Sequence, residues 1–344
     1  MKNKKICLEY IWIDAFDNTR SKLKVIDVDE NIDYNINMVL EWNFDGSSTG
    51  QAEGRDSDVI LKPINMFINP FINWCESYLV MCETFNKDGT VHSTNHRNKC
   101  AITSLKCQND ECLFGIEQEY ILFGRNGLPY KWLGYEFPGA GAQGPYYCGV
   151  GGDRIFGRDI TLEHLEYCLK AGLKVCGTNG EVMASQWEFQ IGPLSPLEVS
   201  DQLWVARYIL QRVCEKYDCI ASFHPKPYKG NWNGSGGHTN FSTREMRSEG
   251  GLNVIKNACA KFKNTHKEHM SVYGRFNDER LTGFHETSSI DDFSWGISNR
   301  GCSIRIPLNV NKDGCGYLED RRPAANLDPY LATEIIMRTV CLND

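Results

Sequence analysis

Two glutamates, Glu117 and Glu119, stand one residue apart within the apolar stretch Leu113–Phe123. Side chains of a β-strand alternate between its faces, so both glutamates are expected on one face, with Phe114 and Tyr120 on the other. A carboxylate on a buried face is costly unless a cation neutralises it. The stretch therefore predicts a strand that binds a cation through one face, with an ion-paired sheet as the alternative.

Other acids recur in similar settings. Glu188 lies among large apolar residues, Glu181 follows an Asn-Gly turn, and Glu319 precedes an arginine pair. Carboxylates brought together from separate strands are what a hard divalent cation requires. A single glutamate in a strand is more often exposed to solvent, so the hypothesis of a metal-dependent enzyme depends on the set.

His238 is the histidine whose surroundings suggest a ligand, because glycines that let the backbone approach a ligand precede it. A lone histidine is more often structural. A mixed set of histidine and carboxylates favours Mg²⁺ or Mn²⁺, and the lack of clustered Cys and His argues against zinc. His266 and His269 are expected on the polar face of a helix, in contact with solvent.

Arginines gather in the last quarter of the chain, interleaved with Gly, Ser and Asn; they are Arg280, Arg300, Arg305, Arg321 and Arg322. Arginine is suited to bidentate contacts with carboxylates and phosphates. Two or three of them are expected only to pair with acids. Metals held by acids beside an arginine cluster are the components of phosphoryl transfer.

The composition excludes several classes of protein. The 344 residues carry 37 Lys and Arg against 44 Asp and Glu, a net charge of −7, and no basic stripe, so nucleic acid is not expected as a partner. The fifteen cysteines are scattered, odd in number and without a C-x-x-C pair, which indicates reduced thiols in a cytoplasmic protein. No signal peptide and no stretch of membrane-spanning length is found.

Residues 1–90 predict a β-rich domain, and residues 91–344 a larger α+β domain. Short segments rich in β-branched and aromatic residues predict the first strands: Cys7–Ile13, Leu23–Val28, Met38–Trp42, Asp58–Leu61 and Tyr78–Thr84. The polar stretch Asn86–Asn98, with an Asp-Gly turn, is predicted as the linker. Apolar residues at helical spacing then predict helices around Leu162–Leu169, Leu203–Val213, Leu252–Phe262 and Leu331–Val340, the last starting at Asp328-Pro329.

One motif is misleading. Gly139–Gly144 fits G-x-G-x-x-G, but a dinucleotide fingerprint leaves a strand and opens a helix, and prolines flank this one on both sides. We interpret it as a flexible loop. No G-x-x-x-x-G-K-[ST] motif occurs, so any nucleotide is held by a fold other than the P-loop type.

Several ordered sequence blocks, from about Tyr10 to the C-terminus, resemble glutamine synthetase of the eukaryotic type. These blocks are Glu41–Gly50, Phe114–Tyr120, Gln143–Gly151, Gly177–Met183, Gln186–Gln190, Gly230–Gly234, Arg280–Thr287, Asn299-Arg300 and Glu319–Pro323. So many blocks in one order are far more specific than any single motif.

The resemblance implies an N-terminal β-grasp domain and a catalytic domain with a curved antiparallel sheet and flanking helices. It implies ATP-dependent ligation of ammonia to L-glutamate, giving L-glutamine, ADP and phosphate through γ-glutamyl phosphate. It further implies two to three Mg²⁺ or Mn²⁺ ions per active site. A ring homo-oligomer, a decamer of two stacked pentamers, would place the active sites between subunits.

The resemblance also assigns residues. One metal site would be formed by Glu119, Glu181 and Glu188, and another by Glu117, His238 and Glu319. Glutamate would be bound by Asn231, Trp232, Asn233, Gly234, Arg280, Arg300 and Arg321. ATP would be bound by Glu188, Gln190, Asn240, Ser242, Arg300, Arg305 and Tyr317.

The catalytic groups would be Asp45, Glu286, Arg300 and Arg321. Asp45 would take a proton from ammonium in a site shared with the adjacent subunit. Glu286, on a flap, would shield the acyl phosphate from water. Without the resemblance, a turn-capping aspartate and an exposed loop glutamate would be favoured.

Three departures from the family pattern occur. His224 replaces the usual Asp, which is expected to disturb local hydrogen bonding; the Gly139–Gly144 loop is slightly longer; and the N-terminal arm is shortened, which weakens the expectation of a decamer. Alternatives are a γ-glutamyl ligase for another amine, an inactive scaffold or sensor, and a carboxylate-metal nuclease. The presence of Asp45 favours ammonia, and the net charge disfavours a nuclease.

Overall fold

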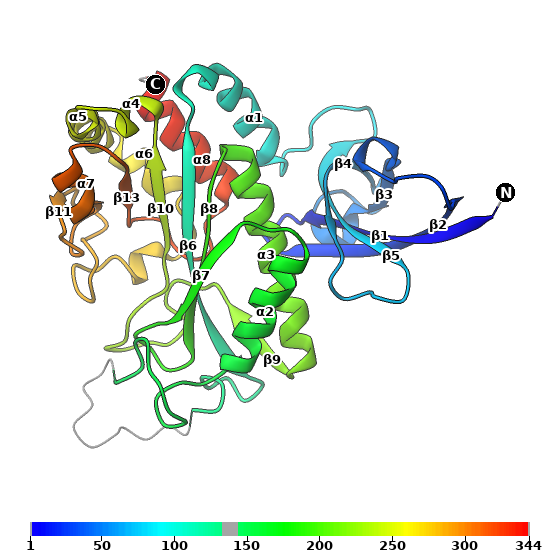
Figure 1. Ribbon diagram of the computed structural model, residues 1–344, viewed down its shortest axis with the longest axis horizontal. Helices are drawn as coiled ribbons and strands as arrows, with labels where there is room; N and C mark the ends of the chain where they lie inside the picture. The colour runs from blue at the N-terminus through cyan, green and yellow to red at the C-terminus, as the bar shows by residue number, and fades with distance from the viewer. Residues whose placement is uncertain (1, 133–143, 343–344) are drawn as a thin grey trace.

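Two β-sheets organise the chain in the computed structural model, which describes residues 2–132 and 144–342 (Figure 1). The smaller sheet has the order β2-β1-β5-β4-β3, in which only the central pair β1/β5 is parallel. Its strands are β1 (Asn3–Ile13), β2 (Thr19–Asp29), β3 (Trp42–Asp45), β4 (Asp58–Ile68) and β5 (Glu76–Asn86). Four of the predicted strands are confirmed, and each is longer than expected.

The predicted strand Met38–Trp42 is wrong. Residues Ile36–Met38 form a 3-10 turn, and β3 begins only at Trp42. The side chain of Asn35 accepts a hydrogen bond from the backbone N–H of Asn37. This local capping bond competes with strand pairing and favours the turn.

The larger sheet has the order β11-β12-β13-β10-β6-β8-β7, with β9 paired to the far end of β6. Its strands are β6 (Leu113–Gly124), β7 (Val175–Gly180), β8 (Gln186–Leu194), β9 (Cys219–Ser222), β10 (Gly237–Ser242), β11 (Trp295–Ile297), β12 (Ile304–Ile306) and β13 (Leu318–Asp320). All pairs are antiparallel except β11/β12. The predicted α+β class and the largely antiparallel second sheet are confirmed.

Four of the longer helices follow the predicted periodicity: α2 (Arg158–Lys170), α3 (Pro196–Lys216), α5 (Gly251–Asn264) and α8 (Pro329–Met337). The helix α1 (His96–Lys106) was not predicted, nor were the short α4 (Arg244–Arg247) and α7 (Leu308–Asp313); α6 (His266–Val272) holds the two histidines placed on a helix. As expected, Asp328 precedes α8, and its side chain caps the helix by accepting a bond from the Tyr330 N–H. The chain then continues as the π-helical turn η5 (Arg338–Leu342), which contains Val340.

The core lies between the larger sheet and the helices that cover one of its faces; α3 and α2 contact the strands, and α8 packs against α1 and α3 (Figure 1). Phe114 and Tyr120 point into this core, as the alternation predicts. The opposite face of β6 is thereby left to the two glutamates. None of the helices in the described part of the chain combines the length and the apolar character needed to cross a membrane.

The expectation of solvated histidines is wrong, because His266 and His269 are both buried. His269 lies 2.6 Å from the Tyr273 hydroxyl and 2.9 Å from Thr339 Oγ1. His266 bonds to the carbonyl of Ile290. The face of α6 that looks polar in the sequence is covered by the C-terminal segment, whose position the local sequence does not indicate.

Candidate active site

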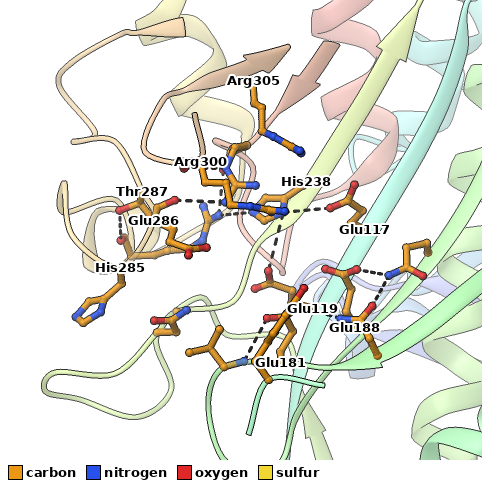
Figure 2. A pocket seen from close by; sticks show the side chains of 18 of the residues that line it. Glu117, Glu119, Glu181, Glu188, His238, His285, Glu286, Thr287, Arg300 and Arg305 are labelled. Atoms are coloured by element: carbon orange, nitrogen blue, oxygen red, sulfur yellow. Dashed lines mark hydrogen bonds and ion pairs between the residues drawn. The ribbon is translucent and has the colours of Figure 1, made fainter. Parts of the chain in front are cut away.

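Five of the six predicted metal ligands line a cavity of about 610 Å³, and the sixth, Glu319, adjoins His238 (Figure 2). In the ladder, Glu119 of β6 is opposite Glu188 of β8, and Glu117 is opposite His238 of β10. Directly opposite residues have neighbouring side chains on the same face. Glu181 follows β7 at the sheet edge, and its carboxylate points into the same cavity.

Glu119, Glu181 and Glu188 form the first acidic cluster, with one carboxylate oxygen of each lying within 4.8 Å of the others. Burial, followed by repulsion from Glu119, raises the pKa of Glu181 to about 8 and that of Glu188 to about 9. Burial raises the pKa of Glu119 to about 7. Two buried acids and one half-buried acid, all resisting ionisation, together form a fitting site for a hard divalent cation.

His238 lies between the remaining predicted ligands. Its Nδ1 is 3.5 Å from Glu117 Oε2 and 3.7 Å from Glu319 Oε1. Burial and the nearby Arg321 guanidinium lower the pKa of His238 well below its usual value, which favours the neutral imidazole that a metal requires. Ligand atoms of Glu117, Glu188 and His238 also lie within 4.8 Å of one another, so the two clusters adjoin.

Glu319 is held differently from the other acids. It accepts hydrogen bonds of 2.6 Å from both Arg305 and Arg321. The carboxylate therefore stands between His238 and two guanidinium groups.

Four of the five clustered arginines line the cavity, namely Arg280, Arg300, Arg305 and Arg321. Arg322 is completely buried elsewhere and forms a charge-assisted pair with Asp320. The expectation that some of these arginines serve only to pair with acids is met by Arg322. The cavity thus has acids on one side and arginines on the other, as the labelled Arg300 and Arg305 illustrate (Figure 2).

The segment with Glu286 lies over the cavity. His285 and Glu286 both have positive φ, at 54° and 61°, a conformation that costs non-glycine residues free energy. Arg321 donates a hydrogen bond to the backbone carbonyl of Glu286. The cavity wall therefore holds this loop through its backbone, and the carboxylate of Glu286 lines the cavity.

The loop predicted to bind glutamate is divided between two cavities. Asn233 and Gly234 line the acidic cavity, whereas Asn231 and Trp232 line an adjoining one that also contains Gly234 and Arg280. The Trp232 ring packs edge-on against Trp132, which fixes the loop.

A second, mainly apolar cavity of about 460 Å³ adjoins the acidic one and shares Glu117 and Gln190 with it. Asn240, Ser242 and Tyr317 line this cavity. The other predicted ATP-binding residues, Glu188, Arg300 and Arg305, line the acidic cavity.

Asp45 is the predicted site residue that lies apart. It is exposed in the small domain, at the start of a 3-10 turn, and accepts bonds from the backbone N–H and hydroxyl of Ser47 at 3.0 and 2.6 Å. The Ser47 and Ser57 hydroxyls lower its pKa. Asp45 is not among the described residues that line the acidic cavity.

Two supporting groups were missed by sequence reasoning. Asn179 donates to Glu181 Oε1 and accepts from Gln190, so it orients one member of each predicted set. The sequence did contain a signal for Asn179, because this residue belongs to the block Gly177–Met183 that resembles the known family. Arg207, discussed below, supports β6 from behind.

One of the noted departures can be placed. The His224 ring stacks on Phe276, and its Nδ1 accepts the backbone N–H of Lys226. Histidine thus supplies the acceptor that aspartate offers in such turns, and the local hydrogen bond is kept. Of the Gly139–Gly144 loop, residues 139–143 lie outside the described residues, as does Gln143 at the start of its block.

Comparison with known protein families gives two matches. Residues 96–341 match the catalytic domain of glutamine synthetase, and residues 5–87 match its β-grasp domain. The β-grasp prediction for the N-terminal sheet is thereby confirmed.

Curated relatives named glutamine synthetase are similar over nearly the whole chain. The protein of Debaryomyces hansenii is 50% identical over 340 residues, covering 99% of this chain and 90% of its own length. That of Schizosaccharomyces pombe is 49% identical, with coverages of 98% and 93%. That of Xenopus laevis is 49% identical, with coverages of 100% and 87%.

Proposed function

This chain belongs to the glutamine synthetase family, and we propose that it acts as a glutamate–ammonia ligase in glutamine biosynthesis. The reaction joins ammonia and L-glutamate at the expense of ATP and releases L-glutamine, ADP and phosphate. The observation that carries the residue assignments is the single cavity in which buried acids face arginines.

The chemistry explains why ATP is needed. A carboxylate is a poor electrophile, because its charge repels nucleophiles and oxide is its only leaving group. Transfer of the γ-phosphoryl group of ATP to the glutamate side chain gives γ-glutamyl phosphate and ADP. Ammonia then attacks the acyl carbon, the C–O bond to phosphate breaks, and a proton is lost.

The acids are proposed to hold two to three Mg²⁺ or Mn²⁺ ions. Glu119, Glu181 and Glu188 would hold one, and Glu117, His238 and Glu319 another. Bound cations would neutralise phosphate oxygens during phosphoryl transfer. The raised pKa of Glu188 supports this proposal, since a carboxyl group that is buried beside other acids keeps its proton until a cation neutralises it.

We propose that the apolar cavity receives the purine of ATP, between Tyr317, Asn240 and Ser242. Glu117 and Gln190 border both cavities, so a nucleotide with its base here would extend its phosphates toward Arg300 and Arg305. Arginine forks fit phosphate oxygens, and preorganised cations stabilise the charge of the moving phosphoryl group.

The glutamate substrate would lie against Arg280 and the Asn231–Gly234 loop, with Arg300 and Arg321 at its reacting carboxylate. Glu286 would cover the acyl phosphate and exclude water. The backbone bond between Arg321 and Glu286 supports this role, because it links the flap to a group at the reaction centre.

We infer that Asp45 serves the active site of a neighbouring subunit in a ring homo-oligomer, for which a decamer is the expected form. The exposure of Asp45 and its place outside its own chain's cavity support an intersubunit role. All fifteen cysteines are free thiols, which supports a cytoplasmic location. The two domains would meet at about residue 90, where β5 gives way to α1.

The alternatives make different demands on the site. An inactive scaffold would be expected to lack a metal ligand or the flap acid, whereas all of these line the cavity or adjoin His238. A ligase for another amine would not need an anion that binds ammonium, and the carboxylate of Asp45 would supply such an anion. Turnover with a panel of amines distinguishes the two ligases.

The test is Glu117→Ala in a coupled assay of ADP release with glutamate and ammonium. We expect kcat to fall by about 100-fold or more, since a cation-holding group at the reaction centre is lost, while the melting temperature without added metal is not lowered. Glu166→Ala, at an exposed acid paired with Lys170, is the matched control and should keep full activity. Glutamine formation at the wild-type rate by Glu117→Ala would overturn the assignment.

A further inference from the structure

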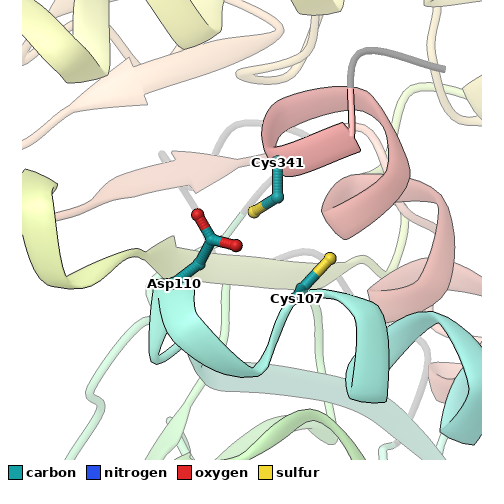
Figure 3. Close-up of side chains that lie close together, drawn as sticks. All are labelled: Cys107, Asp110 and Cys341. Carbon is teal, nitrogen blue, oxygen red and sulfur yellow. The ribbon is translucent and has the colours of Figure 1, made fainter.

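A second group of metal-ligating side chains lies well away from the acidic cavity, where the C-terminal turn η5 packs beside the segment between α1 and β6 (Figure 3). Its members are Cys107, Asp110 and Cys341. Both Sγ atoms and one Asp110 carboxylate oxygen lie within 4.8 Å of one another. In Figure 3 the two sulfur atoms and the carboxylate point toward a common space.

A third thiol adjoins this group. The Sγ of Cys112 lies 3.6 Å from that of Cys341. Two thiolates on one tetrahedral zinc-type ion, each at about 2.3 Å, are separated by about 3.8 Å. The Cys112–Cys341 pair has about this spacing and is too far apart for a disulfide bond, but among the described residues Cys112 completes no set with Cys107 or Asp110, so it stands outside the group.

The surroundings suit a partly enclosed metal site with an entry path. Cys107 and Cys112 are buried, and Cys341 and Asp110 are partly exposed. Cys107 and Cys112 also line a surface groove together with Leu105 and Glu111, through which an ion can approach.

We propose that Cys107, Cys341 and Asp110 form a binding site for one thiophilic divalent cation of the zinc type. Two soft sulfur ligands and one carboxylate select such an ion over Mg²⁺, which prefers oxygen ligands and octahedral geometry. The bound ion joins the C-terminal turn to the segment that leads into β6. The site is structural and separate from the proposed catalytic metals.

The chain contains its own control. Cys7 and Cys75 also place their sulfur atoms close together, at 3.4 Å. Among the residues that the structure describes, however, no third metal-ligating group completes a set with them. Cys7 and Cys75 therefore test, in the same chain, whether a close pair of thiols is enough to bind the ion.

The experiment uses Co²⁺ as a spectroscopic probe. The full chain is reduced until fifteen thiols are titratable, freed of metal, and given excess Mg²⁺ to occupy the carboxylate site. We expect one equivalent of Co²⁺ to produce sulfur-to-cobalt charge transfer and the intense visible bands of tetrahedral cobalt, and Zn²⁺ to bleach both. Cys341→Ser should weaken Co²⁺ binding about tenfold or more, whereas Cys75→Ser should leave it unchanged.

Two outcomes would overturn the proposal: no thiolate band in the reduced wild-type chain, or an equal band in Cys341→Ser. Cys107→Ser provides a second test if Cys341→Ser does not fold, as judged by its ADP-release activity. A folded Cys107→Ser chain that binds Co²⁺ with the wild-type spectrum and affinity would exclude the proposed set.

Discussion

Glu188 shows what burial does to a single side chain in this protein. It lies on an apolar strand and faces Glu119 and Glu117 of β6 and Glu181 beyond β7, while Gln190 donates a hydrogen bond to its carboxylate. Each neighbouring acid adds repulsion to the cost of burial, so ionisation is opposed from every side. The local sequence shows an acid among apolar residues; which other acids it faces was indicated only by the resemblance to a known family.

This residue leads to a prediction about pH. Because the pKa of Glu188 rises from 4.5 to about 9, the folded chain keeps a proton that the unfolded chain releases. Without divalent metal, the stability that depends on this proton is present below pH 4.5 and is lost as pH rises toward 9. A bound cation replaces the proton, so the gain in melting temperature on adding Mg²⁺ should widen between pH 5 and pH 8.5.

Thermal unfolding with and without Mg²⁺ across this range is the measurement. Glu188→Gln removes the titrating group and should flatten the pH dependence of the metal-free chain. A Mg²⁺-induced gain that stays constant from pH 5 to pH 8.5 in the wild-type chain would contradict the prediction.

At the scale of elements, β6 is held to α3 by Arg207, which is buried on the sheet side of the helix. Its guanidinium donates at 2.9 and 2.6 Å to Gln118 Oε1, and also to the carbonyls of Ala325 and Leu327. Gln118 lies between Glu117 and Glu119 on the opposite face of the strand. The clamp therefore fixes the strand that positions both acids.

A signal for this clamp exists in the sequence. Arg207 falls four residues after Leu203, on the apolar stripe of α3, where a charged residue requires partners. Its partners could not be predicted, because Gln118 and the carbonyls of Ala325 and Leu327 are far away along the chain.

Arg207→Met is expected to lower the free energy of unfolding by about 3 kcal/mol, because several buried acceptors lose their donor. Urea unfolding measures this loss. Arg125→Met provides the matched control, since Arg125 and its partner Asp218 are largely exposed and surface pairs contribute little. Equal effects of the two substitutions would show that the Arg207 clamp does not stabilise the sheet.

At the scale of the molecule, Glu9 of β1 links the small sheet to α3, the helix that covers the larger sheet. Its carboxylate accepts bonds from the Tyr208 hydroxyl and from Arg212, both on α3. Asp45 lies on the exposed part of the same small domain. A firm attachment of this domain would hold Asp45 at a fixed place on the surface, as a residue that serves a neighbouring subunit requires.

Mixing two inactive chains tests the shared active site. In a ring assembled from equal amounts of Asp45→Ala and Glu117→Ala chains, about a quarter of the sites would combine an intact Asp45 with an intact Glu117. We expect activity at low ammonium to recover to about that fraction after dissociation and reassembly. Each variant reassembled alone is the control. If the mixed chains reassemble to the mass of the oligomer but recover no activity, an intersubunit role of Asp45 is contradicted.

Patterns confined to one strand or helix were predictable from the sequence. The alternation around Glu117, the helical spacing of Leu203–Val213 and the cap at Asp328 were each confirmed. Predictions failed where a distant segment or a competing local bond decided the outcome. Thr339 covers His269, and the Asn35 side chain replaces strand pairing at Ile36–Met38.

The sequence by itself determined the class of fold, the faces of the strands and the kinds of ligand available, because these depend on residue type and local period. Tertiary structure alone decided which acids share a cavity, which arginine pairs with Asp320 and which thiols approach Cys341. Those neighbours are set by strand order and by the path of the C-terminal segment. Both are products of packing across the whole molecule, and no short stretch of sequence encodes them.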